Sequence, residues 1–180
     1  MKKSLLLLLT VLMVAACNNI EKSKDQIVAA SDKRDVLMEN LRELNRNIGG
    51  ELERWSFYQG ELVNNPGNPT NLTPEQQTEL NKLLEQFTNY SAAFSAFIQE
   101  VNGLAKEFPT QQVELDSMRK AANGLGTYEG NFKKKVADVE AANAAIEAKI
   151  KGWEERATKL GQEIEANYKK IRALQGMPIE

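Results

Sequence analysis

The chain has 180 residues, with 23 basic and 25 acidic side chains, one cysteine and no histidine. The lack of histidine removes the commonest general base and transition-metal ligand, which excludes Ser-His-Asp and Cys-His catalysis, zinc sites and Glu-x-x-His di-iron bundles. The nearly balanced charge lacks the basic stripe of a nucleic-acid-binding surface. We therefore expect a protein that is not an enzyme, binds no nucleic acid and needs no cofactor or metal.

The start of the chain has a pattern of its own. Lys2 and Lys3 precede an apolar run from Leu5 to Val14 that only Thr10 interrupts. A transmembrane helix needs about 20 apolar residues, so this run is too short for one. The run closes on small residues before the lone cysteine: Val14, Ala15, Ala16 and Cys17. An ordinary cleaved signal peptide with an incidental cysteine is one interpretation of this ending.

The same ending resembles the lipobox of bacterial lipoproteins. The resemblance implies that residues 1–16 are a signal peptide and that Cys17 becomes the lipid-attachment site, carrying a diacylglyceryl group and fatty acids such as palmitate. Two or three acyl chains would hold the protein stably on a membrane. Asn18 stands where enterobacterial lipoproteins kept in the inner membrane usually have aspartate, which favours the outer membrane, facing the periplasm or the cell surface. Residues 17–180 are then expected to form a single domain.

The first predicted helix covers residues 20–63. Large apolar side chains recur every three or four residues from Leu37 to Leu62, with a single gap near Gln59, which places them on one stripe of a helix. Gly49 and Gly50 lie inside this stripe, and two glycines cost a helix about 2 kcal/mol relative to alanine. They predict either a bend or the close approach of a neighbouring helix. Residues 17–31 are polar and weakly patterned, which indicates a tether or the first turns of the helix.

The second predicted helix covers residues 74–108, after a turn rich in asparagine and proline. Thr73 is the expected N-cap, Pro74 the first helical residue and Gln76 the partner of Thr73 in a capping box. Pro109 is expected to end this helix. We interpret its aromatic-rich stripe as a helix core, with a ligand-binding face as the alternative: Leu80, Leu84, Phe87, Tyr90, Phe94, Phe97, Val101, Leu104 and Phe108.

The third predicted helix covers residues 110–175, because a stripe that is apolar except at Glu129, Asn143 and Asn167 keeps alternating spacings of three and four from Leu115 to Leu174. Glycines between Gly124 and Gly130 argue for a break, which would give a four-helix bundle instead. The unbroken phase argues for continuity, as does the poor first turn that residues 133–135, all lysine, would make. We favour a single helix that Gly176 and Pro178 terminate.

A helix of that length would extend beyond the other two. Part of its apolar stripe would then stand uncovered and would need a partner. The predicted partner seam comprises Ile146, Ile150, Trp153, Leu160, Ile164 and Ile171. We expect it to self-associate or to dock on another envelope protein, with Asn143 and Asn167 on the same stripe setting the register. The alternative is that these two asparagines lie at the solvent-exposed edge of the bundle.

The sequence therefore predicts an all-α protein, an elongated antiparallel bundle or coiled coil of three long helices. As a membrane-anchored envelope lipoprotein, it would act as a binding or scaffolding rod. An accessory subunit of a secretion, efflux or envelope-assembly machine is the alternative, followed by a carboxylate-dependent envelope hydrolase. Non-covalent contact with peptidoglycan is a further partner interaction that this interpretation leaves open.

Overall fold

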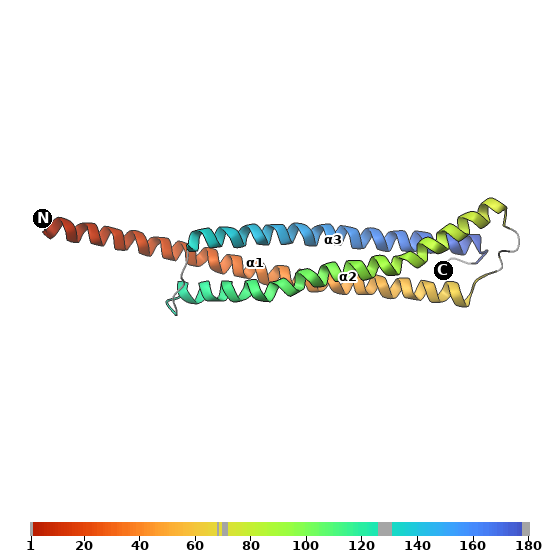
Figure 1. Cartoon of the computed structure of the whole chain (residues 1–180), viewed down its shortest axis with the longest axis horizontal. Coiled ribbons are helices and arrows are strands. Elements are labelled where there is room, and N and C mark those ends of the chain that lie inside the picture. The colour runs from red at the N-terminus through yellow and green to blue at the C-terminus, as the bar shows by residue number, and fades with distance from the viewer. Residues whose placement is uncertain (1, 68, 70–71, 126–130, 178–180) are drawn as a thin grey trace. The chain divides into compact units, whose positions relative to one another are not determined.

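The computed structural model describes residues 2–67, 69, 72–125 and 131–177, and within these ranges the side chains of residues 2–23, 110, 111 and 132 are not described. The protein is all-α, with three long helices packed antiparallel, as the sequence predicts. Their bounds are Lys2–Asn64 for α1, Pro74–Ala122 for α2 and Phe132–Leu174 for α3. In Figure 1, α2 runs in the direction opposite to α1 and α3.

The chain forms two compact units, and each of the three helices contributes to both. The first unit consists of Met1–Asn40 and Ala105–Lys149, and the second of Leu41–Leu104 and Ile150–Glu180. Each unit therefore combines one segment of α1, one of α2 and one of α3, with its own buried side chains.

The core of the first unit includes residues near the start of the predicted domain. Ile27 is fully buried in a cluster with Met118 and Val136, and Ala122 packs against it. The helical form and this burial agree, from Ile27 onward, with the second interpretation of residues 17–31, the first turns of the helix. Helix α1 also begins at Lys2 rather than near residue 20, because no glycine or proline interrupts the sequence before Gly49.

The core of the second unit is rich in aromatic side chains. Trp55 stacks on Phe87 with ring centroids 6.3 Å apart, and its indole N–H donates to the Phe87 carbonyl at 2.9 Å. Phe94 is 1% exposed, and Phe97 is fully buried in a T-shaped ring contact with Trp153. The aromatic stripe of α2 is thus a helix core, as its spacing predicts.

Two of the predicted helix ends are confirmed. The Gln76 N–H donates to the Thr73 hydroxyl at 3.3 Å and the Thr73 N–H donates to the Gln76 side chain at 2.9 Å, which is the capping box at the start of α2. At the end of α3, Gly176 has a φ of 66° and donates to the Ala173 carbonyl, while Met177 donates to the Arg172 carbonyl. These two bonds form a Schellman motif, in which glycine accepts the left-handed backbone. Pro178 lies outside the described residues.

The prediction that Pro109 ends the second helix is wrong. Helix α2 continues through Pro109 to Ala122 and bends at residues 110–111. Proline has no N–H to donate, and its ring clashes with the carbonyl four residues earlier, so a helix that continues past it bends. Packing on both sides keeps the chain helical, because Phe108 and Leu115 are both buried in the first unit.

The prediction of one continuous helix over residues 110–175 is also wrong. Helix α2 ends in a second Schellman motif, in which Gly124 has a φ of 72° and the Leu125 N–H donates to the Lys120 carbonyl at 2.9 Å. The break therefore lies where the glycines suggested, but it gives three helices because α2 passes through Pro109. The following residues 126–130 lie outside the described part.

The start of α3 explains why its lysines do not prevent a break. Asn131 is the N-cap, since its side-chain oxygen accepts from the Lys134 N–H at 3.1 Å and its carbonyl accepts from the Lys135 N–H. The Lys135 ammonium lies 2.8 Å from the Glu114 carboxylate on α2. A cap and an ion pair to the neighbouring helix therefore make this first turn acceptable.

Gly49 and Gly50 do not mark a close helix contact. Helix α1 runs through both, and a Cβ at either position would meet no atom within 4 Å. The close approach occurs instead at Gly161 of α3, where a Cβ would lie 2.6 Å from a carboxylate oxygen of Glu51. The two glycines thus leave open space beside α1.

Candidate functional site

The predicted lipid-attachment residue, Cys17, lies in α1. Its side chain is among those that are not described, as are the side chains of the whole segment before it. In the described part of the chain, no helix combines the length and the apolar character needed to span a bilayer.

The predicted partner seam is covered by the chain itself. Ile146, Ile150, Ile164 and Ile171 are buried, and Trp153 and Leu160 are partly buried. The cover follows from the break near Gly124, which lets α3 pack along α1 and α2 instead of extending beyond them. The uncovered stripe that motivated self-association is therefore absent from these six residues.

The two asparagines of the same stripe bind different helices. Asn143 is 3% exposed, and its amide donates to the Ala30 carbonyl of α1 at 2.9 Å. Asn167 is partly buried and donates to the Tyr90 hydroxyl of α2 at 2.7 Å. Burial, together with the nearby Glu163 carboxylate, raises the pKa of the Tyr90 phenol, so this hydroxyl stays neutral at physiological pH.

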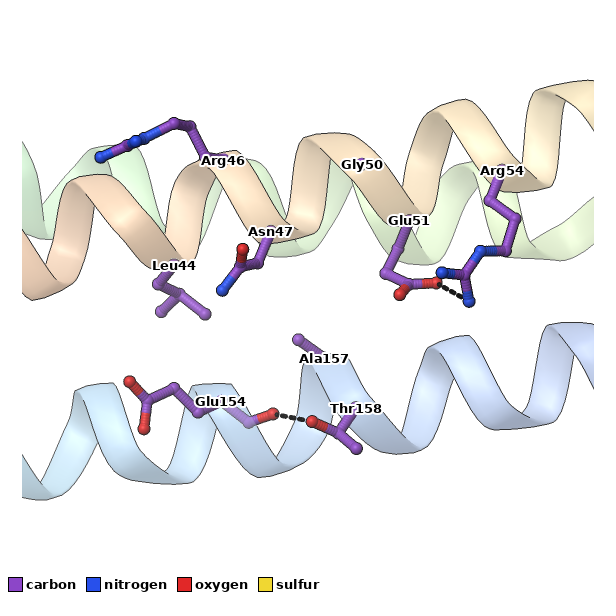
Figure 2. Close-up of a pocket in the computed structure, with 9 residues that line it drawn as sticks. All are labelled: Leu44, Arg46, Asn47, Gly50, Glu51, Arg54, Glu154, Ala157 and Thr158. Atoms are coloured by element: carbon purple, nitrogen blue, oxygen red, sulfur yellow. Dashed lines mark hydrogen bonds and ion pairs between the residues drawn. The ribbon is translucent and has the colours of Figure 1, made fainter.

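A polar groove of about 450 Å³ lies between α1 and α3 in the second unit. Figure 2 shows its lining, in which α1 presents several polar side chains to α3 across a gap. The lining residues used below are Asn47, Gly50, Glu51, Arg54, Glu154 and Thr158. Its volume falls within the range of about 300–1,000 Å³ that is usual for small-molecule sites.

One residue on the α1 side of the groove has no side chain. Gly50 lines it directly, and a Cβ there would meet nothing within 4 Å. On the opposite wall, α3 contributes the small Ala157, which points towards α1 in Figure 2. A helix with glycine at an interior position loses about 1 kcal/mol relative to alanine, and no packing contact compensates for that loss here.

Opposite charges line one end of the groove. A guanidinium nitrogen of Arg54 lies 3.3 Å from a carboxylate oxygen of Glu51, and both side chains point towards α3. Gly161 permits this arrangement, because any larger residue would displace the Glu51 carboxylate from the α3 backbone. Arg46 also borders the groove, but its side chain points away from α3 in Figure 2.

The other end of the groove carries polar groups that are available to a ligand. Among the described residues, the Asn47 amide and the Glu154 carboxylate form no hydrogen bond or ion pair. The Thr158 hydroxyl donates to the Glu154 backbone carbonyl at 3.0 Å, which leaves its lone pairs as acceptors. This end can therefore bind hydrogen-bond donors, a cation included.

The sequence prediction missed this groove. Its residues belong to no motif, and the charged ones are indistinguishable from the solvated flank of a helical bundle. The detectable signal is the glycine pair, which lowers helix stability and has no packing role. No arrangement of three or more acidic or cysteine side chains that could hold a metal ion occurs in the described ranges.

The fold and the groove together define an all-α helical-bundle protein with a mixed-charge groove between two parallel helices. No protein-family model, no curated protein and no solved structure matches the chain. A functional proposal for this protein therefore depends on its own residues.

Proposed function

We propose that the protein is a bacterial lipoprotein, anchored in the cell envelope through Cys17, whose helical domain binds or scaffolds an envelope component. The observation that carries the proposal is the order of residues before Cys17: two lysines, an apolar run too short to span a bilayer, and small residues directly before the lone cysteine. Asn18 after the cysteine favours the outer membrane.

The arrangement of the domain relative to the anchor supports a binding role. Helix α1 carries Cys17, and the first buried side chain among those that the structure describes is Ile27, ten residues after the cysteine. The open groove between α1 and α3 offers polar groups for a ligand, whereas only Trp153 and Leu160 of the predicted seam are partly exposed. We therefore favour a binding role over the alternative of an accessory subunit that docks on a larger machine through the predicted partner seam of α3.

The test is lipidation of the full chain in a bacterial host. We expect the wild-type protein to incorporate a clickable palmitate analogue, to show a diacylglyceryl mass on its N-terminal peptide and to sediment with membranes. Cys17→Ser should lose the label and remain unprocessed or soluble, because serine provides no thiol for acyl transfer. Asn19→Ser is the matched control and should behave as wild type. Membrane-bound, processed Cys17→Ser protein would contradict the proposal.

A further inference from the structure

The groove between α1 and α3 carries separated opposite charges along its length. The register of the two helices is fixed by the approach of Glu51 to Gly161. Glu154 precedes Gly161 by seven residues, which corresponds to about 10 Å along the helix axis. The Glu51–Arg54 ion pair and the Glu154 carboxylate therefore lie at opposite ends of the groove, as Figure 2 shows.

The groups between these ends suit a peptide backbone. Asn47 lies between Glu154 and the ion pair and points into the gap. Its amide has donors and an acceptor, so it can bind the N–H and the C=O of a peptide group together. Gly50 leaves the neighbouring space free of side chains. Arg54 lies three residues beyond Glu51, so the two charged ends are separated by about 10–15 Å along the helix axis. An extended peptide covers about 3.3–3.6 Å per residue, so about three to four residues would cover this distance.

The charges also fix an orientation. Glu154 has no ion-pair partner in the described part of the chain and can accept an ammonium group. Arg54 has five N–H donors, and only its contact with Glu51 engages them as an ion pair, so it can also bind a carboxylate. A ligand with an ammonium group at one end and a carboxylate at the other would satisfy both ends of the groove.

We infer that this groove binds a short peptide of about three residues with a free ammonium group and a free carboxylate, the ammonium on Glu154 and the carboxylate on Arg54. The inference deepens the proposed function. Peptide binding itself does not depend on the envelope location, but the source of the peptide does. Free oligopeptides have this chemistry at their two ends, whereas a cell-wall stem peptide, whose terminal amine is bound to muramic acid in an amide, has it only through the side-chain ammonium of its diamino acid.

The inference is tested by calorimetric titration of trialanine into the full-length lipidated protein in detergent. We expect saturable binding with one site per chain. Acetylation of the peptide amine, or amidation of its carboxylate, should weaken binding about tenfold, since each removes one charge-assisted hydrogen bond. No binding of trialanine at millimolar concentration, or equal binding of the capped and free peptides, would overturn the inference.

Two substitutions connect this binding to the groove. Gly50→Leu places a side chain in the open space and should abolish binding, whereas Gly49→Leu changes the adjacent residue, which does not line the groove, and should leave the affinity unchanged. Thermal unfolding checks that both variants fold. Equal affinity of Gly50→Leu and wild type would contradict the inference.

If Gly50→Leu is too unstable to be measured, a variant that removes a charge from the groove tests the same binding site. Glu154→Gln should bind trialanine about tenfold more weakly and should show no further loss when the peptide is acetylated, because the two changes remove the same interaction. A full acetylation penalty in Glu154→Gln would place the ammonium elsewhere and overturn the assignment.

A parallel titration with a purified disaccharide-peptide from the cell wall distinguishes the sources. Weaker binding than trialanine, as for acetylated trialanine, supports free oligopeptides. Equal or tighter binding supports a cell-wall peptide held through its side-chain ammonium, and both outcomes lie within the inference. This result is independent of lipidation: loss of acylation in Cys17→Ser concerns the anchor alone, and loss of peptide binding in Glu154→Gln concerns the groove alone.

Discussion

Asn143 is a buried polar residue in the core of the first unit. Its amide nitrogen donates to the Ala30 carbonyl, while its amide oxygen is buried and has no partner among the described residues. A buried amide that is only partly satisfied costs stability compared with an apolar side chain of similar size. Its specific bond to α1 nevertheless disfavours other registers of α3, which is the established use of an asparagine in a helical seam.

We therefore predict that Asn143→Leu raises the free energy of unfolding by about 1 kcal/mol beyond the effect of helix propensity. The exposed Asn45→Leu on α1 measures the propensity effect alone. Denaturant unfolding gives both values, and sedimentation should reveal additional oligomers only for the Asn143 variant. A destabilised Asn143→Leu variant that stays monomeric would show that the hydrogen bond stabilises the fold and does not select the register.

At the scale of the elements, two glycines affect the stability of α2 in opposite ways: Gly124 directly after its end and Gly103 in its interior. Gly124 ends the helix with a φ of 72°, a conformation that disfavours residues with a Cβ by about 1–2 kcal/mol. Gly103 lies inside the same helix, where a Cβ would meet no atom within 4 Å. Alanine is therefore compatible with the second position and strained at the first.

We predict that Gly124→Ala lowers the free energy of unfolding by about 1 kcal/mol, because the Schellman motif requires the left-handed backbone. Gly103→Ala should raise it by about the same amount, because alanine is the better helix former. Chemical denaturation of the two variants measures both changes. A neutral or stabilising Gly124→Ala would mean that α2 does not end in the described motif.

At the scale of the whole molecule, stability depends on the cores of the two units rather than on exposed apolar residues. Phe94 is 1% exposed in the second unit, and Phe57 on α1 is 64% exposed. Both are phenylalanines within helices, so the same truncation separates the effect of burial from that of residue type.

We predict that Phe94→Ala costs about 3–5 kcal/mol, a large fraction of the stability of an ordinary domain. Phe57→Ala should change the free energy of unfolding by less than about 0.5 kcal/mol, as is usual for surface positions. Equilibrium unfolding followed by circular dichroism measures both. If Phe94→Ala unfolded at the same denaturant concentration as wild type, the aromatic stripe of α2 would not be a core.

The sequence alone determined the helical class, the aromatic core of α2 and the helix ends at Thr73 and Gly176. These features depend on local physics: a period of 3.6 residues, a capping box and a left-handed glycine. The same local rules gave the wrong result at Pro109, where a helix end was predicted, and at Gly124, where continuity was favoured, because each position has one signal for a break and another for continuity.

Only the tertiary structure decided these two positions, since packing of Phe108 and Leu115 keeps α2 helical past Pro109, while the Asn131 cap and the Lys135–Glu114 ion pair allow a new helix to begin. Because the chain turns back there, α3 packs along α1 and α2, and this packing buries most of its predicted partner seam. It also places Asn47 and Glu154 on opposite walls of the groove that Gly50 borders. Residues far apart in sequence become a site only through the register of two helices, which no local pattern encodes.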